Sequence, residues 1–463
     1  MENTQFPSQL QYNIKNLSGH SKTCVRLTPD KYDNIKPNDV IRVALPNNTL
    51  VDMSTLCFYY EFIGDTGSHH PRLSSSIIKN LAIYLNGNLV ENIQNYSVLY
   101  NRIYDMDGGG SDQTAKRFLE NTDPSVYYET GITTTSANTG IFKLTSTSDA
   151  VKRKFAITSW LGLISTLSTK IWDTNDLNRV EIELTFESGN VCFQKQAQAQ
   201  VTGGYTISDA HFLINKVVFN NPLYYNMKSA KLLSSGLTIG YQTWICSKGA
   251  LAAKSSSFNV QTSINTTSLD ALVGCFTPED QTTSNLLLST HWYSAASVLD
   301  TPKPFNNVIS LTSIGTEGAG GINAGGYYNQ SRFFRSDACG LTSSSWSINN
   351  VPLMPIPLTD YEIYNESLIA LGGNHTDMGI GVHEGLRGLA FFLKYYFTHV
   401  CSLEMLNTQS FTKSGLDGRS SSLNVVWTTS FGANTSDKVV PYIFAKTTRI
   451  LQINEGHSIS VIV

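Results

Sequence analysis

The chain has 463 residues, of which 41% are hydrophobic and 11% aromatic, enough for full hydrophobic cores without metals or disulfides. Only 15% of the residues are charged, below the usual fraction of about a quarter, and the formal net charge is −3. This balance argues against a protein that holds nucleic acid by counterion release, because that mode needs clustered Lys and Arg.

The cysteines and the hydropathy pattern bear on the compartment. Seven cysteines are odd in number, far apart and without a CxxC pair, which predicts free thiols in a reducing compartment. The N-terminal MENTQFPSQL has neither the charged nor the apolar region of a signal peptide. Because no apolar run approaches about 18 residues, we expect neither secretion by a signal peptide nor a membrane span.

Residues 1–38 have little periodicity and predict an extended N-terminal arm, which would pair with a neighbouring subunit or run over its own domain. Alternating apolar residues then predict strands at Val40–Leu45, Leu56–Phe62 and Leu81–Leu85. The pair Asn86-Gly87 lies between two apolar runs and predicts a tight hairpin.

A helix is predicted directly after this hairpin. Asn95 is placed to cap it, and the glycines at 108–110 are placed to end it. Its apolar residues recur at i, i+3, i+4 and i+7, which predicts one buried face formed by Tyr96, Leu99, Tyr100 and Ile103.

The same pattern recurs about 265 residues later, which suggests a duplicated domain. Asp360 is the predicted cap of this second helix, and Gly372-Gly373 is the predicted stop. The predicted packed face consists of Tyr361, Tyr364, Leu368 and Leu371.

Between the two helices, residues 108–150 are rich in Thr, Ser and Gly, which predicts a long projecting loop. The segment Phe155–Ile164 is predicted to be ordered again. Strict alternation in Arg179–Phe186 predicts an antiparallel strand with one solvated face. Tyr205–Phe219 is predicted to close the first domain. A helix is expected at 222–235, with Leu223, Met227, Ala230 and Leu233 on one face and Gly236 as the stop.

The second half repeats this style. Its predicted strands are Leu237–Ile245, Phe258–Ile264, Leu272–Phe276, Leu389–Phe397, Leu423–Phe431, Tyr442–Ala445, Ile450–Ile453 and Ile459–Val463, with a loop at 313–345. Strands at this spacing without alternating helices indicate antiparallel sandwiches. The expected organisation is an arm at 1–38, a first β domain at 39–221, a connecting helix at 222–236 and a second β domain at 237–463.

Candidate chemical sites are weak, and we predict no catalytic residue, no cofactor and no metal. Asp105, Asp107 and Asp112 lack the residue order of a calcium loop. His69-His70, and His375 with His383 and Glu384, match no zinc spacing.

Nucleophilic and phosphate-binding chemistry is no better supported. Cys401 follows His399 by two residues, yet no group that would lower its pKa is evident, so a packed cysteine is the preferred interpretation. The glycine run at 318–326 opens no helix within a βαβ unit, as a phosphate loop would. The tyrosines of the two helices are interpreted as packing residues rather than as a sugar-binding platform.

Several segments, taken in order, resemble one known family. In the first half these are the LNG hairpin, the helix NYSVLYNRIYD, the strand RVEIELTF and YTISDAHFLINKVVF. In the second half they are SWSINNVPLMPIPLTDYEIYNESLIALG, the segment Leu389–Leu416 and LNVVW. Together they resemble the hexon-like double jelly-roll major capsid proteins, particularly those of virophages, polinton-like viruses and adintoviruses, over nearly the whole chain outside the two long loops.

The resemblance implies two consecutive eight-stranded antiparallel jelly rolls with short accessory helices and long loops. It implies a non-enzymatic coat protein whose pseudo-hexameric homotrimers tile an icosahedral shell around double-stranded DNA. The expected partners are further copies of the chain and minor capsid or penton proteins, without sequence-specific DNA binding. The expected location is the virion, after synthesis in the host cytoplasm. The loops at 110–150 and 313–345 are expected at corresponding places in the two halves, forming the outer crown and trimer contacts.

Two other functions stay open at this stage. A tandem jelly-roll carbohydrate-binding or host-attachment protein would need a concave aromatic site. A β-sandwich hydrolase would need a pair of carboxylates at catalytic distance in a cleft.

Overall fold

The computed structural model describes most of both halves of the chain. The described residues are 20–64, 68–69, 73–107, 152–166, 171–177, 179–189, 193–194, 204–219, 222–234, 236–250, 252–253, 257–278, 341–370, 397–404, 415–419, 422–432, 438–454 and 458–462. The first nineteen residues of the predicted arm, most of both long loops, Cys192 and Cys339 therefore lie outside the described residues. Among the described residues, no helix is both long and apolar enough to cross a membrane.

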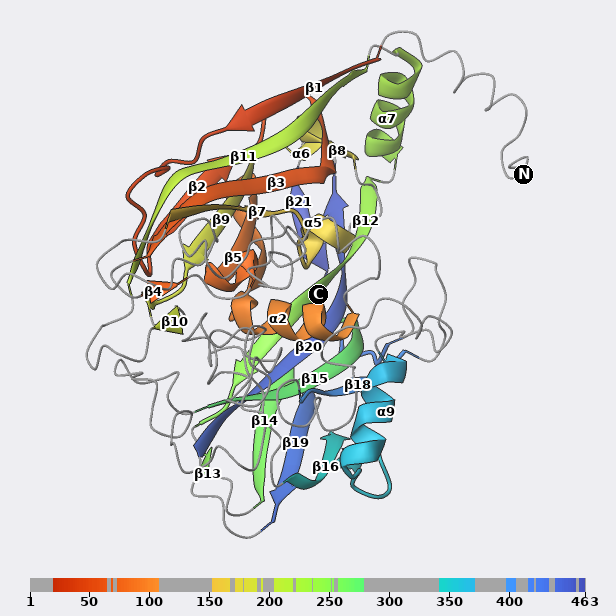
Figure 1. Cartoon of the computed structure of the whole chain (residues 1–463). Coiled ribbons are helices and arrows are strands. Elements are labelled where there is room, and N and C mark those ends of the chain that lie inside the picture. The colour runs from red at the N-terminus through yellow and green to blue at the C-terminus, as the bar shows by residue number, and fades with distance from the viewer. Residues whose placement is uncertain are drawn as a thin grey trace, which may run out of the picture.

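The first half forms two antiparallel sheets (Figure 1). One has the order β1 (His20–Leu27), β11 (Tyr205–Phe219), β3 (Leu50–Gly64) and β7 (Lys152–Ile157), with β8 (Ile171–Asp173) also pairing with β3. The other has the order β2 (Val40–Ala44), β9 (Val180–Phe186), β5 (Ile78–Leu85) and β6 (Asn88–Ile93). A short pair, β4 (Ser68–His69) with β10 (Phe193–Gln194), stands apart from both.

The second half forms two further antiparallel sheets. One has the order β12 (Leu237–Lys248), β20 (Lys438–Ile453), β15 (Ser268–Pro278) and β18 (His399–Ser402), with β13 (Ala252–Ala253) and β21 (Ile459–Ile462) also pairing with β20. The other has the order β14 (Phe258–Ile264), β19 (Leu423–Phe431), β16 (Leu341–Ile348) and β17 (Val351–Pro352).

The two halves share one topology. When the eight main strands of each half are numbered along the chain, the first sheet has the order 1-8-3-6 and the second has the order 2-7-4-5 in both halves. Two sheets connected in this way form a jelly roll. The prediction of two consecutive eight-stranded antiparallel jelly rolls is therefore confirmed, whereas the exact domain boundaries stay a prediction.

The strands form where the sequence alternates. In β9, Val180, Ile182, Leu184 and Phe186 are buried and the residues between them are half-buried. The Asn86-Gly87 turn joins β5 to β6, and both residues have positive φ angles of 50° and 78°, as a two-residue type I′ hairpin requires. The second half has a two-residue turn of the same kind. Asn349 and Asn350, with φ angles of 52° and 64°, join β16 to β17.

Two strand predictions are wrong in extent. Tyr442–Ala445 and Ile450–Ile453 belong to one strand, β20, because the intervening polar residues continue its pairing with β12, and Thr447 is fully buried. The loop predicted at 313–345 ends before Leu341, where β16 begins. Ser344 is buried in this strand and hydrogen-bonds there, so a run of serines does not mark a loop at this place.

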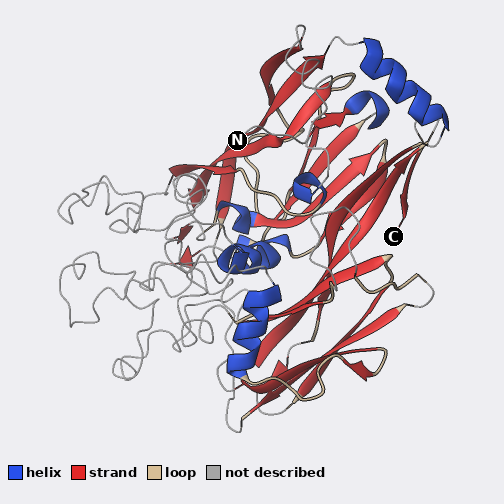
Figure 2. Ribbon diagram, turned by 90° about the vertical axis from the view of Figure 1, so that its right-hand side faces the viewer, coloured by secondary structure: helices blue, strands red, loops and turns tan. Residues whose placement is uncertain are grey.

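The helices lie at the sides and the end of this framework (Figures 1 and 2). They are α2 (Tyr96–Asp107), α5 (Leu163–Thr166), α6 (Thr174–Leu177), α7 (Pro222–Ser234), α9 (Asp360–Ala370) and the 3-10 helix η1 (Ser74–Ile77). Each long helix of the two sandwiches, α2 and α9, follows a hairpin in the same place of the topology, which fits the suggested duplication.

The two long loops occupy different places in the topology. Residues 108–151 connect α2 to β7 and so lie between the fifth and sixth main strands of the first half, β6 and β7. Residues 279–340 connect β15 to β16, the third and fourth main strands of the second half. The prediction that these loops correspond is wrong, because the segment equivalent to 108–151 joins α9 to β18.

One sheet serves two hydrophobic cores. Alternate residues of β15 point in opposite directions: Leu272 and Phe276 pack in the second sandwich, whereas Val273 and Cys275 pack in the core of the first half. In β20, Tyr442 and Phe444 likewise pack in the core of the first half, while Ile443 packs in the core of the second sandwich. The sheet of β12, β20, β15 and β18 is thus buried on both faces, and the sandwiches are in apolar contact across it.

Candidate functional site

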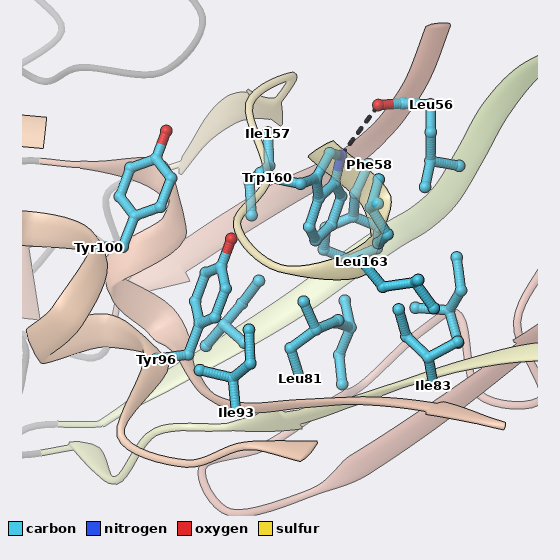
Figure 3. Packing of buried hydrophobic residues seen from close by; sticks show 14 of the residues in the cluster. Leu56, Phe58, Leu81, Ile83, Ile93, Tyr96, Tyr100, Ile157, Trp160 and Leu163 are labelled. Atoms are coloured by element: carbon cyan, nitrogen blue, oxygen red, sulfur yellow. Dashed lines mark hydrogen bonds between the residues drawn. The ribbon is translucent and has the colours of Figure 1, made fainter. Parts of the chain in front are cut away.

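Helix α2 packs into the first core, beside the junction with the second half. Tyr96 is fully buried, Tyr100 is buried and stacks on Tyr96 with ring centroids 5.8 Å apart, and Ile103 packs partly buried against the same core. The Tyr96 hydroxyl accepts a hydrogen bond from the backbone N–H of Leu161 at 3.1 Å. Figure 3 shows Tyr96 beside Ile93 and Leu81, with Tyr100 at the edge of the group. The predicted packing role of this stripe agrees with these positions.

Asn95 precedes α2 as predicted, but its side chain bonds outside the helix. Its backbone has a φ angle of 51°, and its carbonyl accepts the first helical hydrogen bonds, from Val98 at 3.1 Å and Leu99 at 3.2 Å. The side-chain amide instead donates to Sγ of Cys246 on β12, at 3.2 Å. Asn95 therefore connects the start of α2 to the second half.

The predicted face of α9 is wrong by about one position. Tyr361 is 70% exposed, and Tyr364 and Leu368 are only half-buried. The residues that face inward are Ile363 and Ser367, one helical turn apart. The aromatic residues suggested the wrong stripe, because the buried face of this helix includes a serine whose hydroxyl donates to the carbonyl of Thr398 at 2.8 Å.

The cap of α9 is also shifted by one residue from the prediction. Thr359, not Asp360, takes the N-cap position, since its carbonyl accepts the N–H of Ile363 at 2.9 Å. The Glu362 carboxylate accepts from the backbone N–H of Thr359 at 2.8 Å and from its hydroxyl at 2.9 Å. This pair belongs to the capping-box type, in which the residue at N3 reaches back to the cap.

A buried glutamate, Glu91 on β6, marks the junction between the sandwiches. Its two carboxylate oxygens accept the backbone N–H of Leu163 at 3.0 and 2.9 Å. Thr243 of β12 hydrogen-bonds to the same carboxylate, and Arg449 of β20 acts on it electrostatically. Burial raises the pKa of Glu91 to about 7, against the opposing effects of these three partners.

Further polar bonds join the halves around Glu91. The Tyr241 hydroxyl of β12 donates to the carbonyl of Val90 at 3.1 Å. The hydroxyl of Thr166 on α5 donates to the carbonyl of Gln242 at 3.0 Å, and the N–H of Gln242 donates back to that hydroxyl at 2.9 Å. The junction thus combines an apolar face with hydrogen bonds that cross from one half to the other, which suits a fixed interface between two domains.

No pattern in the sequence indicates that Glu91 is buried. A register shift in the β5–β6 pairing leaves Val90 and Glu91 buried side by side, so the alternation that identifies inward residues fails there. Gly162, whose φ angle is 77°, lies against the carboxylate, and a Cβ atom at this glycine would stand 2.4 Å from Oε1 of Glu91.

A buried serine, a buried histidine and a partly exposed glutamate in the second sandwich resemble a hydrolytic triad. The Ser344 hydroxyl lies 2.7 Å from Nδ1 of His399, and Nε2 of His399 lies 3.8 Å from Glu366. However, Ser344 and His399 are both buried, and the indole N–H of Trp427 donates to the serine oxygen at 2.8 Å. Burial lowers the pKa of His399. Because the serine and the histidine are enclosed in the core, this arrangement gives a substrate no access.

The other predicted candidates form no chemical centre among the described residues. Cys401 is buried, and burial raises the pKa of its thiol to about 12, which agrees with a packed cysteine. The described cysteines 24, 57, 246, 275 and 401 are free thiols. Within the described ranges, no three His, Cys, Asp or Glu side chains gather as a metal site would require. Asp112, His375, His383, Glu384 and the glycine run at 318–326 lie outside these ranges.

Helix α7 has its apolar stripe on the outside. Met227 is 65% exposed and Leu233 66% exposed, and Ala230 between them is exposed as well. Its inward side carries Tyr224, Lys228 and Leu232. The sequence correctly groups Met227, Ala230 and Leu233 on one face, but that face points to solvent.

No protein-family model matches the sequence, and no curated protein matches it either. Solved structures do match its fold. The PBCV-1 virus capsid structure has a TM-score of 0.61 at 11% identity, covering 96% of this chain and 97% of that chain. The Sputnik virophage structure has a TM-score of 0.53 at 11% identity, covering 96% and 88%, respectively. The mavirus major capsid protein has a TM-score of 0.52 at 11% identity, covering 99% and 94%.

The topology and these matches define one class of fold. The chain has the double jelly-roll architecture, and it resembles in structure the major capsid proteins of viruses and virophages over nearly its whole length. At 11% identity, the likeness concerns the fold, and it extends through both sandwiches and the sheet between them.

Proposed function

We propose that the chain is a structural major capsid protein without enzymatic activity. The observation that carries this proposal is the match of both jelly rolls, in order, to the mavirus major capsid protein over 99% of this chain and 94% of that one. A match to one jelly roll alone would carry little weight, because this sandwich serves many unrelated functions.

The proposed assembly is a homotrimer of pseudo-hexagonal outline that tiles an icosahedral shell around a double-stranded DNA genome. Three copies of a chain with two topologically equivalent sandwiches present six similar walls, as hexagonal tiling requires. The junction supports this role, because a two-sided sheet holds the sandwiches in one fixed relation. A wall built from two loosely linked domains would lack that fixed geometry.

The proposed partners are other copies of the chain, within the trimer and between trimers, and minor capsid or penton proteins. The proposed location is the virion, after synthesis in the host cytoplasm. A charge fraction of 15% and a net charge of −3 support contacts with protein rather than sequence-specific contacts with DNA. The loops predicted at 110–150 and 313–345, the second of which ends before Leu341, are proposed for the outer crown and for contacts within the trimer.

The mass of the purified protein in solution tests the proposal. We expect a particle three times the mass of the 51.0 kDa chain, by light scattering coupled to size-exclusion chromatography. An obligate interface of this kind buries more than about 2,000 Å², so the trimer should persist on dilution to micromolar concentration. A stable monomer at that concentration would contradict the proposal.

Negative-stain microscopy provides the second measurement. Two sandwiches of roughly 25 kDa per subunit predict hexagonal particles about 70–90 Å across. Round or elongated particles of trimer mass would support a homotrimer but contradict the pseudo-hexagonal arrangement.

A further inference from the structure

Polar bonds hold α7 against the first sandwich. Nζ of Lys228 lies 2.6 Å from Oδ2 of Asp173 on β8 and 3.1 Å from Oδ1 of Asp176 on α6. All three side chains are largely buried, and the Tyr224 hydroxyl adds a bond to Asp173 at 3.3 Å. Among the described apolar residues of α7, Leu232 packs against the core.

This arrangement reverses the usual orientation of an amphipathic helix, which turns its apolar side to the core. Met227, Ala230 and Leu233 follow one another at three-residue spacing and form a stripe on the side opposite Lys228. The ion pairs fix the orientation of the helix, so it cannot rotate to bury the stripe without separating Lys228 from two buried carboxylates. The stripe is therefore held on the outside of the fold, where another apolar segment can pack against it.

The N-terminal segment of the chain starts from the right place to supply this cover. The first residue of β1, His20, pairs with Phe219 at the end of β11, and α7 begins three residues later, at Pro222. Strand β1 runs away from α7, so the chain before His20 leaves the sheet at the end that carries the helix (Figure 1).

The composition and length of this segment suit the stripe. Leu10, Tyr12 and Ile14 alternate with polar residues, so an extended chain would present all three on one side. They lie six to ten residues before His20, a stretch that spans about 20–33 Å when extended. The thirteen residues of α7 span about 20 Å. Tethering to the same fold also gives this segment a high effective concentration at the stripe.

We propose that residues 1–19 pack along the outward apolar stripe of α7 in the same chain, with Leu10, Tyr12 and Ile14 against Met227, Ala230 and Leu233. The segment then acts as a strap that fastens the connecting helix from outside, while Lys228 fastens it from inside. This inference is independent of the proposed capsid function, since it concerns one chain by itself.

Site-specific photocrosslinking tests the contact. Met227 is replaced by p-benzoylphenylalanine in the full-length protein, which is irradiated and then mapped by peptide mass spectrometry. We expect crosslinks to residues 1–19 at the mass of a single chain on a denaturing gel. The same photoreactive residue at Val351, exposed on β17 of the other sandwich, is the control and should not reach residues 1–19.

Three results would overturn the proposal: no crosslink, a crosslink to another part of the chain, or a crosslink at the mass of two chains. The last would mean that a second copy covers the stripe.

Hydrogen exchange gives an independent readout of the same contact. Deleting residues 2–17 should raise amide exchange in 222–234 several-fold, because the strap no longer protects the helix. The double substitution Met227→Ser and Leu233→Ser should produce the same rise, and combining it with the deletion should add nothing further. Unchanged exchange in the deletion variant, with the ion pairs of Lys228 intact, would contradict the proposal.

Discussion

Two tyrosines that look alike in the sequence have opposite surroundings in the structure. Tyr96 is fully buried at the start of α2, whereas Tyr361, the second residue of α9, is 70% exposed. Replacing Tyr96 by Asp puts a charge into an apolar site, and we expect a loss of at least about 3 kcal/mol in the free energy of unfolding. Tyr361→Asp is the matched control and should change it by less than about 0.5 kcal/mol.

Chemical denaturation of the two variants measures this difference. Tyr96→Phe separates the two contributions of Tyr96, because it keeps the ring and loses the hydroxyl that accepts the hydrogen bond from Leu161, at a cost of about 1 kcal/mol. Equal stability of Tyr96→Asp and the unchanged protein would mean that α2 does not pack as described.

Glu91 makes the stability of the junction depend on pH. Its folded pKa of about 7 lies above the ordinary value of 4.5, so the folded protein holds this proton more tightly than the unfolded chain. Below about pH 4.5 the carboxyl is protonated in both states and does not lower the free energy of unfolding. As the pH rises from about 4.5 to about 7, ionisation of Glu91 lowers this free energy increasingly. Above pH 7 the penalty is full, roughly 3 kcal/mol from the size of the shift.

Glu91→Gln keeps a hydrogen-bond acceptor for Leu163 and removes the charge. We expect this variant to unfold at higher denaturant concentration than the unchanged protein at pH 8 and to lose this advantage at pH 5. Glu183→Gln, on the β9 face where Arg42 pairs with the carboxylate, is the control and should keep the original pH dependence. A Glu91→Gln variant with the same pH profile as the unchanged protein would rule out this role.

At the scale of elements, two glycines with nearly the same backbone angle differ in what surrounds them. Gly162 and Gly87 have φ angles of 77° and 78°, but only at Gly162 would a Cβ atom meet a neighbour, Glu91. Gly87→Ala therefore carries the backbone strain alone, about 1 kcal/mol. Gly162→Ala adds a clash with a buried carboxylate, and we expect at least twice that loss.

Thermal or chemical unfolding of both alanine variants checks this comparison. Because the hairpin turn at Gly87 is open to solvent on its Cβ side, its variant measures the strain common to both sites. Equal losses in the two variants would mean that Glu91 moves aside without cost.

The strands could be predicted from the sequence far better than the helix faces. Strict alternation identified β9 and the inward residues of β3, and the Asn86-Gly87 pair identified its hairpin. Apolar periodicity fails where polar residues are buried with their own partners, as at Ser344 in β16 and Ser367 in α9. A pattern of apolar residues cannot register a hydroxyl whose hydrogen bonds are satisfied inside the fold.

The candidate site was hardest to predict. Periodicity shows which side of a helix is apolar, and it did so for α7, but it does not show whether that side faces inward. In α7 the buried ion pairs of Lys228 with Asp173 and Asp176 decide the orientation, and these residues are more than fifty positions apart. The junction around Glu91 likewise joins β6, α5, β12 and β20, a meeting that depends on topology.

At the scale of the whole molecule, the sandwiches are not independent. The sheet of β12, β20, β15 and β18 contributes residues to both cores. Residues 237–463 produced alone would leave Val273, Cys275, Tyr442 and Phe444 without the first half that covers them. We expect this fragment to aggregate or to bind a hydrophobic dye such as ANS, unlike the full chain.

The full-length protein under the same buffer conditions is the control for this experiment. A fragment that stays monomeric, leaves the dye unbound and unfolds in one sharp transition would mean that the second sandwich is stable without its neighbour.

The two-sided sheet also restricts where the genes of related proteins can recombine. A crossover near residue 236 would join β12, β15 and β20 from one parent to β6, α2 and α5 from another, and their facing side chains would no longer fit. The stretch between Pro278 and Leu341, in contrast, joins two strands of one sandwich, so its replacement keeps the facing strands of both halves from one parent. Recombination among relatives should therefore spare the halves as a unit and favour the replacement of single loops.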